Sequence, residues 1–180
     1  MAVIPTPDEA LALVKKYNKE DFHIKHAETV SKVMGWFAAR HAPGEEEYWR
    51  TVGMLHDIDF ELYPEQHCQK AVELLREADV DEGVIRSVIS HGYGLCSDVK
   101  PEKYMEKVLY AVDELTGLIG AAALMRPTGM EGMDAKSVMK KFKSKSFAAG
   151  CSREVIQNGA DMLEISLSEL ISLTLEAMNS

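Results

Sequence analysis

The stretch that decides the fold runs from Val108 to Met125 and reads VLYAVDELTGLIGAAALM. Its apolar side chains recur every three to four residues, which is the period of one face of an α-helix. With Pro101 as the opening residue, the pattern predicts a long buried helix over 101–125. Asp113 lies inside this apolar stretch, where a buried carboxylate requires a partner that compensates its charge. The expected buried stripe comprises Val108, Val112, Leu115, Ile119 and Ala122.

Helical patterns continue on both sides of this stretch. Thr6-Pro7-Asp8-Glu9 is a typical helix start, with a capping residue, a proline and an acidic residue in order. No run alternates with a period of two, so no strand is expected. We therefore predict an all-α, single-domain bundle over 1–180, with a core of about 20–125 and a C-terminal helical extension of about 134–178. The other expected helices are 6–17, 22–41, 45–57, 65–78, 81–91, 136–145 and 152–178.

Composition narrows the class of protein. The chain has 180 residues, 46% of them hydrophobic, which suffices for one core and excludes low-complexity disorder. The net charge of −9 disfavours the broad coating of nucleic acid, which needs a basic footprint. Three scattered cysteines, no signal-peptide pattern and no long apolar run predict a soluble cytoplasmic protein without a membrane segment. The oligomeric state stays open.

Several polar residues fall where the hydrophobic pattern expects burial. They are His26, His56, Asp57, His91 and Asp113. A buried carboxylate without a partner costs several kcal/mol, and a cation among converging histidines and aspartates removes that cost. Imidazole plus carboxylate suits Zn, Fe, Mn or Ni. Taken singly, each residue has a plainer explanation: a lone histidine can be a hydrogen-bonded core residue, and an aspartate can cap a helix or pair with a lysine.

The order of these residues resembles a known family. His26-Ala27-Glu28-Thr29-Val30, then Gly53-Met54-Leu55-His56-Asp57-Ile58, then Asp113 after Val108-Leu109-Tyr110-Ala111-Val112 is similar to the H…HD…D signature of the HD superfamily of metal-dependent phosphohydrolases. The similarity covers about residues 20–125. It implies an HD-type all-α bundle of at least five helices.

Two further histidines, His67 and His91, are similar to those of the binuclear branch of that superfamily. For His67 the plainer alternative is a solvated residue at a helix start. The resemblance implies one or two divalent transition metal ions (Fe, Mn, Zn, Ni or Co). It implies that His26, His56, Asp57 and Asp113 hold the first ion and that Asp57, His67 and His91 hold the second.

The chain also departs from the family pattern. Where many members continue with Ile-Gly-Lys, this chain has Ile58-Asp59-Phe60. Asp59 thus adds a carboxylate, which would hold the attacking water, orient a ligand histidine or simply cap the turn. We take Asp57 and Asp59 as the candidate catalytic residues. The full GYP motif of the cyclic-dinucleotide phosphodiesterases is absent.

The segment from Arg126 to Arg153 carries seven basic and two acidic residues. Its net charge is therefore +5, and the rest of the chain carries −14. Lys136 and Lys140 in this segment are candidate substrate-binding residues, because lysines at a rim steer phosphate groups. The plainer alternative is a solvated helix face.

The resemblance predicts a metal-dependent phosphohydrolase. Its metal-activated water would attack a nucleotide or another small phosphoester or phosphoanhydride, and no nucleic acid would be coated. Two alternatives remain: a di-iron oxygenase, and a non-catalytic, metal-stabilised nucleotide-binding module. A metal-free structural domain is the plainest option.

Overall fold

A computed structural model describes all 180 residues, and the prediction of an all-α fold is confirmed. No β-strand forms, and only two isolated bridges occur. None of the helices combines the length and the apolar character that a membrane crossing requires. The elements are α1 (Pro7–Tyr17), α2 (Asp21–His41), α3 (Glu46–Leu55), the 3-10 helix η1 (Pro64–Gln66), α4 (Gln69–Glu77), α5 (Glu82–Ser90), α6 (Tyr104–Leu124), α7 (Ala135–Lys143), α8 (Arg153–Met162) and α9 (Leu167–Met178).

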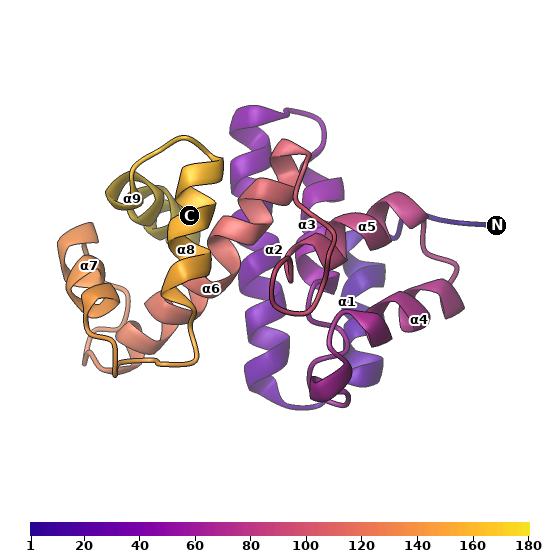
Figure 1. Cartoon of the computed structure of the whole chain (residues 1–180), viewed down its shortest axis with the longest axis horizontal. Coiled ribbons are helices and arrows are strands. Elements are labelled where there is room, and N and C mark those ends of the chain that lie inside the picture. Colours follow the sequence, from indigo (N-terminus) through magenta and orange to yellow (C-terminus); the bar gives the residue numbers. More distant parts are fainter.

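The predicted helix α6 lies at the centre of the molecule. On one side it packs against α2 and α5, and on the other against α7, α8 and α9 (Figure 1). One cluster of 37 buried apolar residues extends across both sides, so the chain forms a single domain. The division into a core of 20–125 and an extension of 134–178 stays a prediction.

Two glycines let helices approach closely. A Cβ at Gly53 of α3 would lie 2.9 Å from Met34 Cγ and 3.1 Å from the carbonyl oxygen of Val30 in α2. A Cβ at Gly159 of α8 would overlap Ala111 of α6. The first contact matters for the site described below, because Gly53 lies one turn before the end of α3, where the predicted site residues begin.

Expected helix boundaries were wrong in three places, at 152–178, at 65–78 and at the start of α6, and local hydrogen bonds explain each of them. The predicted helix 152–178 is two helices, because Glu164 adopts a positive φ of 58° and Ser166 starts α9 by accepting a hydrogen bond from the backbone N–H of Glu169. The predicted helix 65–78 begins only at Gln69. Cys68 before it has a positive φ of 76°, and Asp59 accepts its backbone N–H.

The start of α6 is fixed by Glu106, which is fully buried. Its carboxylate accepts hydrogen bonds from Arg86 at 2.7 Å and from Ser87 at 2.8 Å, both on α5. It also accepts the backbone N–H groups of Glu102 and Lys103, so α6 begins at Tyr104 rather than at Pro101. This ion pair joins α5 to α6 two turns before Asp113.

Candidate metal centre

The first group of site residues meets where α2, α3 and α6 come together. His26 comes from α2, His56 and Asp57 follow α3, and Asp113 lies in the middle of α6. One oxygen of Asp113 lies 3.0 Å from Nε2 of His26 and 3.0 Å from Nε2 of His56. Oδ2 of Asp57 lies 3.5 Å and 3.3 Å from the same two nitrogens. Four ligand atoms therefore surround one point.

The second group uses the other oxygen of Asp57. Oδ1 of Asp57 lies 3.3 Å from Nε2 of His67 and 3.2 Å from Nε2 of His91. The two imidazole nitrogens are 3.1 Å apart. His67 precedes α4, and His91 ends α5. Asp57 thus stands between the two groups and faces each of them with one oxygen.

These separations fit metal coordination. Ligands at 2.0–2.1 Å from a tetrahedral ion lie about 3.4 Å from one another. The atoms of the first group are 3.0–3.5 Å apart along the five pairs measured. The first group offers four donors and the second three. A three-donor set leaves a position for water or a further ligand.

Hydrogen bonds orient the imidazole rings. Nδ1 of His56 lies 2.7 Å from the carbonyl oxygen of Gly53, and Nδ1 of His91 lies 2.6 Å from that of Val88. A carbonyl oxygen only accepts, so Nδ1 carries the proton in both rings. Nε2 of a neutral ring then presents a lone pair to its neighbours. Because these lone pairs face carboxylate oxygens, a proton or a cation must lie between them. Hydrogen bonds from Nδ1 to a backbone carbonyl are typical of histidines that ligate a metal.

The electrostatics of the site point the same way. Burial by itself lowers the pKa of His56, but the charges of Asp57 and Asp113 raise the pKa well above its ordinary value. Burial also opposes the shift at His67, where hydrogen bonds to Asp57 and Asp59 raise the pKa to about 10. Against the cost of burial, the charge of His56 holds the pKa values of Asp57 and Asp113 well below their usual range. The candidate metal centre therefore attracts positive charge.

Asp59 lies behind His67 and is fully buried. Its Oδ1 accepts a hydrogen bond from Nδ1 of His67 at 2.6 Å, and its Oδ2 accepts the backbone N–H groups of Cys68 and Ala71. This is the arrangement of a carboxylate that orients a ligand histidine. The catalytic roles of Asp57 and Asp59 stay predictions.

Lys136 and Lys140 are exposed on α7, which packs against α6 and α9 at the end of the molecule opposite α4 (Figure 1). Their role in binding a substrate stays a prediction. Sequence reasoning missed Glu114, which is half-buried beside the site. Burial together with the charges of Asp113 and Asp57 raises its pKa to about 7. Its position next to Asp113 in the chain was the available signal.

Two thiols that the sequence analysis did not place at the site lie beside the second group. The Sγ atoms of Cys68 and Cys96 both lie within 2.6 Å of the place that a Cβ on Gly92 would occupy. Cys68, His67 and His91 together form a further set of possible metal ligands. The sequence shows that Cys68 follows His67 directly. That Cys96 lies close to Cys68 depends on the turn after α5, which the sequence pattern does not predict.

Comparisons with known proteins give one curated relative to report. A tRNA (cytidine(56)-2'-O)-methyltransferase of Picrophilus torridus is 30% identical over an alignment of 131 positions, and the alignment covers 64% of this chain and 37% of that enzyme. The chain thus spans little more than a third of the length of this relative. No protein-family model matches the chain, and no solved structure matches it.

This relative overturns the functional predictions. Its name describes methyl transfer to a ribose in tRNA, so the assignments to the HD superfamily and to a metal-dependent phosphohydrolase are contradicted. The two alternatives, a di-iron oxygenase and a metal-stabilised nucleotide-binding module, gain no support either. The pattern of histidines and aspartates predicts where ligand atoms meet, and one such geometry serves many reactions.

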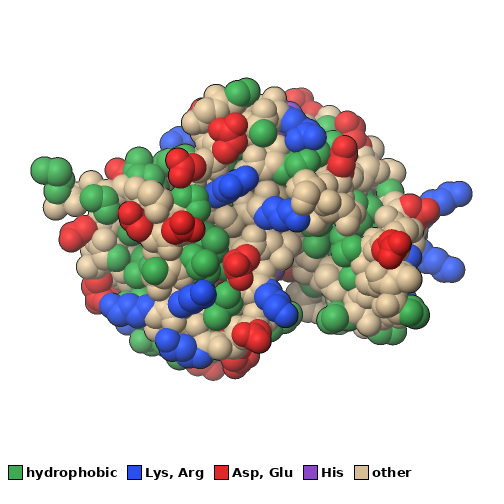
Figure 2. All heavy atoms as spheres, turned by 180° about the vertical axis from the view of Figure 1, so that it is seen from behind, with side chains coloured by type: hydrophobic (Ala, Val, Ile, Leu, Met, Phe, Trp, Pro, Cys, Tyr) green, Lys and Arg blue, Asp and Glu red, His purple; other side chains and the backbone are tan.

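The predicted partner is corrected as well. We expected a small phosphorylated substrate and no coating of nucleic acid, whereas the relative, by its name, acts on a tRNA. The inference failed because net charge sums over the whole surface, while a binding site depends on local charge. In Figure 2 acidic and basic side chains are mixed across one face, and basic side chains project at the end where α7 lies.

Proposed function

We propose that this chain is a metal-binding helical domain that holds two divalent transition metal ions and serves the modification of tRNA. The observation that carries the metal part is the convergence of seven donor atoms on the two sides of Asp57. Their mutual distances match a coordination shell, and the Nε2 atoms of the histidines face carboxylate oxygens. Fe, Mn, Zn, Ni and Co all suit such mixed nitrogen and oxygen donors.

Each residue has a defined part in this proposal. His26, His56 and Asp113 would hold the first ion, His67 and His91 would hold the second, and Asp57 would contribute to both. Asp59 positions His67 through its Nδ1 proton. Bound ions would supply Lewis acidity and a local positive charge that attracts the phosphates of RNA. Glu114, with a pKa raised to about 7, stands beside the centre as a group that holds or releases a proton near neutral pH.

The tRNA part of the proposal is supported by the relative from Picrophilus torridus. Because the chain spans only 37% of that enzyme, we propose a shared substrate and a cytoplasmic place of work rather than the whole activity. Lys136 and Lys140 would contact the RNA backbone. They are four residues apart on α7, so they project from one face of that helix.

Metal analysis tests the first part. Protein purified in the presence of Fe, Mn, Zn, Ni or Co should retain two ions per chain after desalting, and anomalous scattering should give two peaks beside Asp57. His26→Ala should remove one ion and His67→Ala the other. A chain that keeps no ion with any of these metals would contradict the proposal.

Binding of tRNA tests the second part. The double variant Lys136→Ala and Lys140→Ala should weaken tRNA binding and reduce the slope of log K against log salt by about 2, since each lysine releases about one counterion. The matched control is the double variant Lys15→Ala and Lys16→Ala, which removes two exposed lysines from α1. If both pairs act alike, α7 is not the contact.

A further inference from the structure

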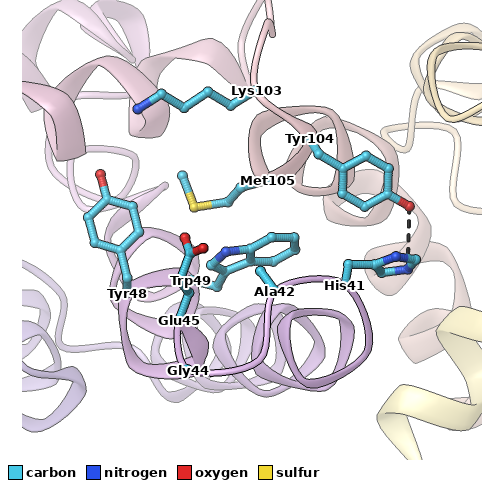
Figure 3. A pocket seen from close by; sticks show the side chains of 9 residues that line it. All are labelled: His41, Ala42, Gly44, Glu45, Tyr48, Trp49, Lys103, Tyr104 and Met105. Atoms are coloured by element: carbon cyan, nitrogen blue, oxygen red, sulfur yellow. Dashed lines mark hydrogen bonds between the residues drawn. The ribbon is translucent and has the colours of Figure 1, made fainter.

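A pocket opens at the end of α2 and α3 that lies away from the metal centre (Figure 3). It has a volume of about 640 Å³ and is lined by the end of α2, the start of α3 and the start of α6. Trp49 and Tyr104 belong to its walls, and the hydroxyl of Tyr104 lies 3.4 Å from Nε2 of His41. No buried polar side-chain atom of this lining lacks a partner, so the pocket indicates no particular ligand. The groups that do indicate a chemistry lie beside the second group of metal ligands.

Two thiols meet there, and a glycine makes room for them. Gly92 follows His91, and the sulfur atoms of Cys68 and Cys96 both lie within 2.6 Å of the place that a Cβ on Gly92 would occupy. The two sulfurs are therefore neighbours in space, and both cysteines are free thiols. Cys68 is buried, whereas Cys96 is partly exposed. A small reagent in solution thus reaches the pair through Cys96.

The backbone on both sides fixes this pair. The N–H of Cys68 donates to Oδ2 of Asp59 at 2.7 Å, and Cys68 has a positive φ of 76°, which is uncommon for a residue other than glycine. The carbonyl oxygen of Cys96 accepts a hydrogen bond of 2.6 Å from the side chain of Gln69, the first residue of α4. The turn that carries Cys96 is therefore fastened to the start of the helix that Cys68 precedes.

The pair also adjoins the ligands of the second ion. The sulfur of Cys68 and one ring nitrogen each of His67 and His91 lie within 4.8 Å of one another. The Nε2 atoms of both histidines face Oδ1 of Asp57, and three such donors leave a position for a further ligand. A thiolate is a ligand that Zn and Fe favour, whereas the sulfur of a disulfide carries no charge. The chemical state of Cys68 therefore bears on the second ion.

We propose that Cys68 and Cys96 are a redox-active pair whose oxidation to a disulfide weakens the binding of the second ion. In the reduced chain Cys68 supplies a fourth ligand to that ion. Hydrogen peroxide oxidises the thiol of Cys96 to a sulfenic acid and leaves as one water; the thiol of Cys68 then forms the S–S bond and expels the second water. Two molecules of a small thiol reverse the step and leave as their own disulfide.

The effect is reciprocal by thermodynamic linkage. If the disulfide weakens the second ion, a bound ion shifts the thiol–disulfide equilibrium toward the thiols by the same factor. The first ion should be unaffected, because its ligands face the other oxygen of Asp57. The coupling to the ion rests on the metal part of the proposed function, whereas the formation of the disulfide does not.

Thiol counting tests the disulfide. The full chain has three free thiols. After chelation of metal, one equivalent of hydrogen peroxide should leave one free thiol, with a loss of about 2 Da that dithiothreitol reverses. Proteolytic digestion should give a peptide pair that joins Cys68 to Cys96. Three surviving thiols, a disulfide that includes Cys151, or a disulfide between two chains would overturn the proposal.

Cobalt tests the coupling. Co²⁺ that is bound by a thiolate absorbs in the near ultraviolet through charge transfer from sulfur, so the reduced protein should show this band. Oxidation should remove the band and weaken the second ion by at least about tenfold, while the first ion stays. A second ion that is held equally well after oxidation would overturn the coupling.

Three variants separate the roles of the cysteines. Cys68→Ser should lack the cobalt band and bind the second ion weakly in the reduced state. Cys96→Ser keeps the thiol of Cys68, so it should show the band and hold the ion, yet it should form no disulfide within the chain. Cys151→Ser is the matched control and should behave as the parent chain in both tests. If Cys68→Ser keeps the band, Cys68 is not a ligand and the inference fails.

The outcomes also distinguish this inference from the proposed function. If the reduced chain binds no second ion, the metal part of the proposed function fails and the coupling fails with it, while the thiol count still decides whether the pair is redox-active. If the reduced chain binds two ions without a charge-transfer band, the two-ion centre stands and the role of Cys68 is overturned.

Discussion

The two ends of the α2–α3 pair carry opposite kinds of site. At one end His26 and His56 turn their nitrogens toward carboxylates in a closed centre. At the other end Trp49 and Tyr104 line an open pocket. From His26 to His41, α2 rises by about 22 Å, so one pair of helices separates the two. The metal centre concentrates ligand atoms in one place, whereas the open pocket offers aromatic surfaces.

The difference teaches what each end tolerates. In the centre every ligand atom lies 3.0–3.5 Å from another, so one changed residue disturbs all the others. In the pocket Tyr104 and Glu45 are exposed and face solvent, so a change there costs little stability. Variants that line the pocket should therefore leave metal binding unchanged.

The largest expected effect is that of Asp57→Asn. An amide has one oxygen and no charge, so neither ion keeps its shared ligand, and the number of bound ions should fall from two to one or none. Saturating metal stabilises a binding protein by about 4 kcal/mol at a thousandfold excess over Kd, and the variant should lose most of this gain. Elemental analysis and thermal melting with and without metal measure both.

The control for this variant is Asp161→Asn, which changes an exposed aspartate on α8. This variant should keep two bound ions, and metal should raise its melting temperature as much as it raises that of the parent chain. If Asp57→Asn also keeps two ions, the bridge between the two groups does not exist.

The next effect is that of Asp59→Asn. Loss of a carboxylate that orients a ligand histidine costs roughly 10–100-fold in metal affinity. The second ion, held by His67 and His91, should therefore be lost first, while the first ion stays. Competition with a chelator, followed at the two sites by anomalous scattering, distinguishes them. Equal weakening of both ions would mean that Asp59 acts on the fold rather than on His67.

The contrast between the two ends also shows what the sequence could predict. Helical periodicity predicted the all-α fold and put polar residues on buried faces, whereas the resemblance to the H…HD…D signature implied that His26, His56, Asp57 and Asp113 meet. The same reasoning placed Asp59 near the centre but could not find its partner, because the turn before α4 brings its carboxylate onto Nδ1 of His67.

The pocket could not be predicted, because its walls come from three segments and none has an unusual pattern. Tyr104 follows a lysine at a helix start, and Trp49 belongs to the apolar stripe of α3. Only packing shows that both residues line one pocket. The reaction was out of reach for a different reason, since a ligand pattern specifies donors and not the substrate.

A third prediction concerns pH. The pKa of His67, raised to about 10, means that the metal-free protein holds a proton where the second ion would sit. Metal must displace this proton, so the affinity for the second ion should rise about tenfold per pH unit below that pKa. Isothermal titration in buffers of different ionisation enthalpy should detect the released proton.

The stability of the metal-free protein should change in the opposite sense. Because the folded pKa of His67 exceeds the ordinary value of 6.5, its contribution to stability is complete below pH 6.5 and is lost as pH rises toward about 10. The melting temperature of the chelated protein should therefore fall as pH rises over this range, whereas the melting temperature of the metal-loaded protein should rise. Parallel slopes would show that no ion replaces the proton.

The smallest effect on the fold is expected from His41→Ala, at the open end. The ring of His41 is exposed and packs flat over Phe37 and against Tyr104, so its loss should change the free energy of unfolding by no more than about 0.5 kcal/mol and leave two ions bound. It should nevertheless loosen the ring of Tyr104, which loses its hydrogen-bond partner at the pocket mouth, and the NMR signals of that ring should report the change. Loss of metal in this variant would mean that the two ends are coupled along α2, and an unchanged Tyr104 signal would mean that the ring needs no support from His41.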